Sequence, residues 1–113
     1  MSVSFGGGMG RLRQVCGAVS AMAMLVGFKY PVPDKDDREA RTRNYAMVQK
    51  VAGLFKEEHQ TIICRELLKP SEAASVTPTP SARTKEYYSK RPCARFVATA
   101  ATIAGRMLKG ELD

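Results

Sequence analysis

Residues 15–28 read Val-Cys-Gly-Ala-Val-Ser-Ala-Met-Ala-Met-Leu-Val-Gly-Phe, a run of 14 residues without a charged side chain. A helix that spans a bilayer needs about 18–20 apolar residues, so this run is too short to cross a membrane. It predicts instead a helix that begins at residue 11 or 14, ends at residue 26 and is buried on nearly all sides. The small residues near its start predict a close approach by a neighbouring element.

The chain that follows this run predicts further helices and no strands. A polar linker at residues 34–39 supplies capping residues for a second helix. Its apolar stripe comprises Tyr45, Val48, Ala52, Phe55, His59 and Ile62. Thr61 can cap a short third helix at residues 62–68, which Pro70 ends. No segment shows the sustained alternation of apolar and polar residues that is typical of a strand.

The last third of the chain predicts one more long helix. Residues 69–82 are rich in Pro, Ser, Thr and Ala and predict a flexible loop, while residues 83–89 predict a turn of helix. Pro92 stands where a helix would begin. The apolar stripe after it comprises Phe96, Val97, Ala100, Ile103, Ala104, Met107 and Leu108. We therefore expect an all-α fold, in which residues 1–113 form one small bundle of about three main helices with short helical pieces.

The net charge of +7 is unevenly distributed along the chain. Residues 1–33 carry +3 and residues 83–95 carry +4, whereas the other segments together cancel. Nucleic-acid-binding proteins usually present a denser basic stripe with stacking aromatic residues or a groove-reading helix. Only Tyr87 and Tyr88 lie within the 83–95 stretch, so the sequence disfavours nucleic acid as a partner.

Three cysteines cannot form a closed set of disulfides within one chain. At least one thiol is therefore free, bound to a metal or paired outside the chain. Although Arg11 and Arg13 precede the apolar run, residues 1–10 carry no positive side chain and no small-residue cleavage site follows the run, so a signal peptide is not predicted. We expect a cytoplasmic protein whose thiols are kept reduced.

Cys64 and Cys93 each fall in the first turn of a predicted helix. The free N–H groups and the positive dipole end of a helix favour a thiolate there. The neighbouring residues Arg65, Arg91 and Arg95 act in the same direction. The sequence thus predicts reactive thiolates, and the competing interpretation, given equal weight, is that the cysteines are small apolar core residues.

A shared metal site is a further interpretation of the cysteines. The spacings of Cys16, Cys64 and Cys93 match no zinc-ribbon or CxxC pattern, so the fold would have to assemble them. His59 is the only histidine and could complete a Cys3His zinc site. Its place on an apolar stripe near a helix end favours a structural role instead.

The glycine-rich segment at residues 6–10 precedes a predicted helix, as phosphate-binding loops do. Its glycines fit neither the GxGxxG nor the Walker pattern. We assign Gly7, Gly8 and Gly10 as candidates that let the backbone pass close to the cysteine site. Arg91 and Arg95 join them as candidate cofactor-binding residues that offset the charge of thiolates.

Four motifs in sequence order resemble those of a known family. They are Phe5-Gly-Gly-Gly-Met-Gly10, Cys16-Gly17-Ala18-Val19-Ser20, Ile62-Ile63-Cys64-Arg65-Glu66-Leu67-Leu68 and Arg91-Pro92-Cys93-Ala94. Over nearly the whole chain they resemble the C-GCAxxG-C-C family of four-cysteine proteins, which are described as redox-active. The resemblance implies a small helical protein whose cysteines converge on a redox or metal-binding centre. A partial similarity to split-Soret cytochromes makes an iron–sulfur cluster a candidate occupant beside zinc.

The chain departs from the family pattern at two points. Ala21 stands where the family motif has its second glycine. Family members also carry a cysteine on a helix ahead of the glycine-rich loop, whereas this sequence starts at Met1 just before that loop. We therefore expect an N-terminally truncated domain whose exposed apolar surface favours a homo-oligomer. A three-thiolate site would then be completed by a second subunit, an outside ligand or His59.

The leading hypothesis is a redox-active cysteine protein in which Cys16, Cys64 and Cys93 form a dithiol switch or a metal centre. A redox partner protein would exchange electrons with the switch, and the sequence leaves open which two cysteines pair. The alternative is a non-catalytic helical interaction protein with buried structural cysteines and a basic partner-binding patch at residues 83–95. No general acid–base pair supports an enzyme.

Overall fold

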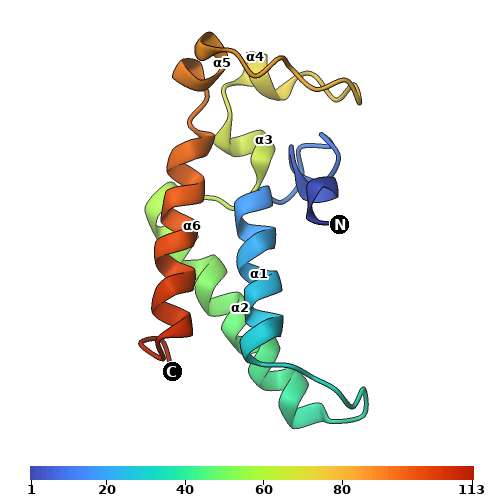
Figure 1. Ribbon diagram of the computed structural model, residues 1–113, viewed down its shortest axis with the longest axis vertical. Helices are drawn as coiled ribbons and strands as arrows, with labels where there is room; N and C mark the ends of the chain where they lie inside the picture. The colour runs from blue at the N-terminus through green and yellow to red at the C-terminus, as the bar shows by residue number, and fades with distance from the viewer.

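The computed structural model describes residues 1–113 and contains helices but no strand, as predicted. The elements are η1 (Ser2–Phe5), α1 (Gly17–Lys29), α2 (Arg38–His59), α3 (Cys64–Leu67), α4 (Pro70–Ala73), α5 (Lys85–Lys90) and α6 (Cys93–Leu108). Figure 1 shows that α1 and α6 run in one direction and α2 runs against them. The short helices α3, α4 and α5 lie beyond the end of this bundle at which α1 and α6 begin (Figure 1).

Capping residues set two of the helix starts close to the predicted positions. Asp37 is the N-cap of α2, and its carboxylate accepts the N–H of Ala40 at 3.0 Å. Pro92 is the N-cap of α6, so Cys93 becomes the first residue of that helix. The sequence therefore determines locally where these two helices begin.

Helix α1 begins later than predicted, at Gly17. Arg11 and Arg13 adopt positive φ angles of 67° and 62°, which a right-handed helix cannot contain. Residues 11–16 instead form an irregular segment that leads from the glycine-rich loop into α1. This difference matters for the site because it places Cys16 at the helix start rather than in its middle.

Helices α1, α2 and α6 enclose one core of 12 buried residues. These residues are Val19, Met22, Val26, Met47, Val51, Phe55, Phe96, Ala100, Ile103, Ala104, Met107 and Leu112. Full burial of a large apolar side chain contributes about 1.5–3 kcal/mol relative to exposure. The three long helices therefore stabilise one another, and α3 packs mainly against α4.

The apolar stripe of α2 is confirmed at Val48, Ala52 and Phe55, which lie in or against the core, but it is wider than predicted. Met47 and Val51 are buried with Phe55, whereas Tyr45 is 60% exposed. Positions 47, 51 and 55 are four residues apart and follow one face of the helix, which α1 and α6 both contact. Tyr45 lies off this face, so its inclusion in the stripe was wrong.

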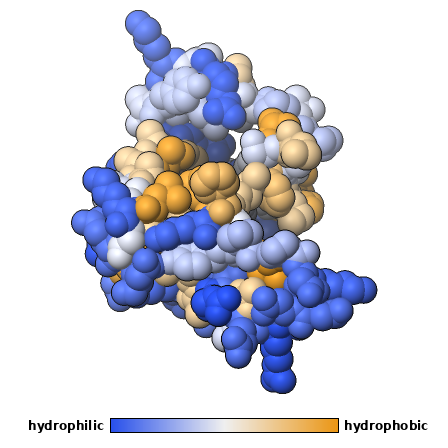
Figure 2. Space-filling view, turned by 60° about the horizontal axis from the view of Figure 1, so that its bottom comes forward, coloured by the Kyte–Doolittle hydropathy of each residue, from blue (hydrophilic) through white to orange (hydrophobic).

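Helix α1 is not buried on all sides, contrary to the prediction. Phe28 is 79% exposed on α1, and Val97 is 58% exposed on α6. A groove of about 320 Å³ runs between the two helices and is lined mainly by alanines and other small or apolar residues. Figure 2 shows apolar side chains in a band across one view of the molecule, bordered by hydrophilic ones. No helix of the structure combines the length and apolar character needed to cross a membrane.

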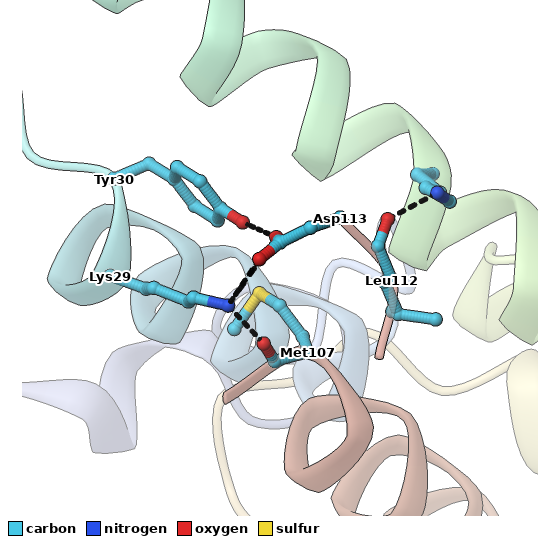
Figure 3. A network of polar contacts seen from close by, with 6 residues as sticks. Lys29, Tyr30, Met107, Leu112 and Asp113 are labelled. Carbon is cyan, nitrogen blue, oxygen red and sulfur yellow. Dashed lines mark hydrogen bonds and ion pairs between the residues drawn. The ribbon is translucent and has the colours of Figure 1, made fainter. Parts of the chain in front are cut away.

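The C-terminal turn is fastened to α1 by the polar network in Figure 3. Lys29 donates to the carbonyl of Met107 and forms an ion pair with Asp113 at 3.4 Å. The hydroxyl of Tyr30 donates to the same carboxylate. This hydrogen bond lowers the pKa of Asp113 and raises the pKa of Tyr30. The network lies near the C-terminus, at the end of α6 that is opposite to the short helices (Figure 1).

Residues 69–82, predicted as a loop, contain one turn of helix, α4. Glu72 accepts the backbone N–H of Lys69 at 3.2 Å and so caps this turn. Residues 75–82 form no helix or strand. The segment therefore returns the chain from α4 to α5 along the cysteine end of the bundle.

Candidate thiol site

The three cysteines lie at one end of the bundle. Cys16 is the N-cap of α1, Cys64 is the first residue of α3, and Cys93 is the first residue of α6. Figure 1 places these three helix starts at the same end of the molecule. All three thiols are free; Cys64 is buried, while Cys16 and Cys93 are half-buried.

A short backbone pairing joins the segment before α1 to the segment before α3. Val15 and Ile63 form an isolated antiparallel bridge. On one side of this bridge the N–H of Cys16 donates to the carbonyl of Ile62 at 2.8 Å. On the other side the N–H of Cys64 donates back to the first segment at 2.6 Å. The pairing therefore holds the backbones of Cys16 and Cys64 side by side.

Side-chain packing groups Cys64 with Cys93. Cys64, Leu68 and Ala73 form a small buried cluster separate from the main core, and Cys93 packs against this cluster. Cys16 packs against the main core instead. Backbone pairing thus ties the segment of Cys64 to that of Cys16, and side-chain packing groups Cys64 with Cys93.

The glycine-rich loop passes directly over Cys64. Gly8 has a φ of +70°, and a Cβ placed on it would lie 2.7 Å from the Cβ of Cys64. The same Cβ would lie 2.6 Å from the backbone nitrogen of Gln14. Only glycine fits this position, and the structure thereby shows the predicted close approach of backbone to a cysteine. Gly7 and Gly10 line a neighbouring cavity.

Burial opposes ionisation of two of the thiols. It raises the pKa of the Cys93 thiol, and the positive charge of Arg91 offsets this only in part. Burial also raises the pKa of Cys16, against the lowering effect of the N–H groups of Ala18 and Val19. Desolvation of the sulfur thus outweighs the helix start and the nearby cation at Cys93, so a smaller fraction of this thiol is ionised than the sequence predicted.

The three arginines predicted to support the thiols differ in their contacts. Arg91 lies close enough to affect Cys93, and its Nε pairs with Glu72 at 3.3 Å. Arg65 donates to a backbone carbonyl at 3.4 Å, and Arg95 is exposed. Neither Arg65 nor Arg95 is among the groups that shift the pKa of Cys16 or of Cys93.

Sequence reasoning missed Arg13. Its side chain is 2% exposed, and its Nη1 lies 4.0 Å from the Sγ of Cys64. Its Nε donates to the carbonyl of Ser75 at 3.1 Å, while its Nη2 is buried without a partner. The only signal in the sequence is a basic residue shortly after the glycine-rich segment, which does not predict burial.

His59 lies apart from the cysteines. Its Nε2 is 2.9 Å from the hydroxyl of Thr99, and its ring packs 4.8 Å, centroid to centroid, from both Phe55 and Phe96. These contacts indicate a structural role. No group of three or more His, Cys, Asp or Glu side chains is arranged to hold a metal ion. The side chains as placed therefore do not fit zinc or an iron–sulfur cluster.

Arg91→Gln is expected to slow alkylation of Cys93 by iodoacetamide at pH 8.5 by about three- to tenfold. Without the positive charge of Arg91, burial and the negative charge of Glu72 raise the pKa of Cys93 further, so a smaller fraction of this thiol is ionised. The rate is measured by mass spectrometry of the Cys93 peptide. Arg95→Gln is the matched control, since it removes a flanking charge that does not act on the thiol. Equal slowing by both variants would contradict this assignment.

A model of one protein family matches the chain. The family is described as Putative redox-active protein (C_GCAxxG_C_C), and the match covers residues 1–107. The matched residues include the glycine-rich loop, all three cysteines and α6 up to its penultimate residue. Comparisons with curated proteins and with solved structures found no match. The chain therefore belongs to the C_GCAxxG_C_C family.

Proposed function

We propose that this protein is a thiol–disulfide redox protein in which Cys64 and Cys93 form the disulfide. The observation that carries the proposal is the packing of Cys93 against the buried cluster of Cys64, at the end of the bundle where all three free thiols gather. Membership of a family described as redox-active supports the same chemistry.

The order in which Cys93 and Cys64 react follows from their different burial. Cys93 is half-buried and Cys64 is buried, so Cys93 is the thiol that an outside disulfide reaches first. The Cys93 thiolate attacks that disulfide, a mixed disulfide forms, and one partner thiol leaves. The sulfur of Cys64 then attacks the sulfur of Cys93 and releases the second partner thiol. Two electrons and two protons thus pass from the protein to the partner disulfide.

Two arginines support the charges that develop in this exchange. The charge of Arg91 favours the thiolate of Cys93, which burial otherwise disfavours. The guanidinium of Arg13, 4.0 Å from the sulfur of Cys64, can stabilise negative charge on that sulfur during the second step. Cys16 takes no part in this disulfide. Its backbone pairs with that of Ile62, and this pairing keeps the segment before α1 beside Cys64.

Oxidation of the reduced protein with bis(2-hydroxyethyl) disulfide, a neutral reagent, tests the proposal. We expect one disulfide per chain, mapped by mass spectrometry of proteolytic fragments to Cys64 and Cys93. Cys93→Ser is expected to abolish it. Cys16→Ser, which also removes one thiol from the same end of the bundle, should leave it intact. A Cys16–Cys64 disulfide would overturn the assigned pair, and three free thiols after full equilibration would overturn the function.

A further inference from the structure

A cavity of about 510 Å³ lies between the glycine-rich loop and residues 78–91. Four arginines line it, Arg11, Arg13, Arg83 and Arg91, and no carboxylate does. Like charges gathered around one cavity repel each other and create a field that attracts anions. The cavity also has the size of a site for a small molecule.

The chain itself compensates little of this charge. Arg91 is the only one of the four that pairs with a carboxylate, that of Glu72. Arg83 lies 5.1 Å from the ring centroid of Tyr87 and forms no ion pair. Arg11 donates to the backbone carbonyl of Thr77 at 3.0 Å, which is a neutral partner. Three of the four guanidinium groups therefore lack an anionic partner within the chain.

The buried side chain of Arg13 is a second, independent observation. Its Nη2 has no hydrogen-bond partner, although the side chain is almost completely buried. A buried charged donor without a partner is costly, because folding removes its water and supplies nothing in exchange. Arg13 also lines the cavity, so its charge adds to the field that attracts an anion there.

We propose that this cavity binds a small organic disulfide that carries carboxylate groups, and holds it beside the Cys64–Cys93 pair. The forked guanidinium group matches the two oxygens of a carboxylate, and several forks in one cavity favour a ligand with more than one such group. Two lining residues connect the cavity to the thiols: Arg13 reaches Cys64, and Arg91 lies beside Cys93. The choice of a disulfide as ligand rests on the proposed function.

Two disulfide reagents whose released thiols are followed by absorbance test this inference. The reagent 5,5′-dithiobis(2-nitrobenzoate) carries a carboxylate on each half, whereas 4,4′-dithiodipyridine is neutral. In each case Cys93 displaces one absorbing thiol, and Cys64 displaces the second as the protein disulfide forms. We measure the rate with the carboxylate reagent divided by the rate with the neutral reagent, and compare this ratio with the same ratio for the free thiol N-acetylcysteinamide. We expect this ratio to be at least about tenfold higher for the protein at low salt, and to fall as salt screens the cavity.

Arg83→Gln and Arg106→Gln form the matched pair of variants. Arg83 lines the cavity without a carboxylate partner, while Arg106 is exposed on the last turn of α6 and removes the same charge elsewhere. Arg83→Gln is expected to lower the rate ratio severalfold, and Arg106→Gln to leave it unchanged. The rate with the neutral reagent should be the same in both variants. A ratio equal to that of the free thiol, or equal effects of both variants, would overturn the inference and leave the redox function standing.

Calorimetric titration with inorganic pyrophosphate tests anion binding without any thiol chemistry. Binding at low salt that weakens at least about fivefold in Arg83→Gln supports the anion site, even if neither disulfide reagent oxidises the thiols and the redox function fails. Absence of pyrophosphate binding, together with no preference for the carboxylate reagent, overturns the site. Pyrophosphate binding without that preference overturns the carboxylate ligand and assigns the cavity to phosphates.

Discussion

Gly8→Ala is expected to lower the free energy of unfolding by about 2–5 kcal/mol. The backbone of Gly8 has a φ of +70°, which costs a residue with a side chain about 1–2 kcal/mol. The added methyl would also lie within 3 Å of the Cys64 Cβ and of backbone atoms of Arg13 and Gln14, and this overpacking adds about 1–3 kcal/mol. Urea unfolding followed by circular dichroism measures the change.

Gly10→Ala is the matched control for this variant. Gly10 also has a positive φ, +55°, but a Cβ placed there would meet no atom within 4 Å. Gly10→Ala should therefore lower the free energy of unfolding only by the conformational strain, about 1–2 kcal/mol. Because the clash at Gly8 acts on Cys64, Gly8→Ala should also slow formation of the Cys64–Cys93 disulfide, while Gly10→Ala should not. Equal losses of stability in the two variants would show that the loop does not pack on Cys64 as described.

Phe55→Ala is expected to lower the free energy of unfolding by about 3–5 kcal/mol. Phe55 is fully buried at the centre of the bundle, with its ring centroid 6.2 Å from that of Phe96 and 4.8 Å from that of His59. Removing the ring leaves a cavity among α1, α2 and α6. Small domains have only about 5–15 kcal/mol of stability, so this single change removes a large part of it.

Tyr45→Ala is the control on the same helix and on the same predicted stripe. The exposed position of Tyr45 predicts a change within about 0.5–1 kcal/mol. If Phe55→Ala does not fold, Phe55→Leu keeps most of the volume and should cost less than about 1.5 kcal/mol. Thermal unfolding by calorimetry measures all three. A larger loss for Tyr45→Ala than for Phe55→Leu would contradict the observed face of α2.

The helix limits were largely predictable because their signals are local. Asp37 accepts an N–H of the next turn, and Pro92 cannot continue a preceding helix, so each acts within a few residues of its own position. All the buried residues of α6 were predicted for the same reason, but Val97 and Leu108, which were assigned to the same stripe, are exposed. The start of α1 was predicted too early, because an apolar run does not reveal that Arg13 adopts a left-handed backbone.

The sequence predicted that Cys64 and Cys93 lie in the first turn of helices, and these positions suggested thiolates. Burial decides otherwise for Cys93, and burial depends on which side chains from distant segments surround the sulfur. The burial of the Arg13 guanidinium could not be predicted either, since its partners, the carbonyl of Ser75 and the sulfur of Cys64, come from segments far along the chain.

The sequence by itself determined an all-α bundle, the starts of α2 and α6, and the position of Cys64 and Cys93 at helix starts. Periodicity, caps and prolines encode these features within one or two helical turns. Only the tertiary structure decided that the three cysteines lie at one end of the bundle, that glycine is required at position 8, and that four arginines line one cavity. These features depend on contacts between distant segments, where small differences in burial and direction change the energy of a charge or a clash by several kcal/mol.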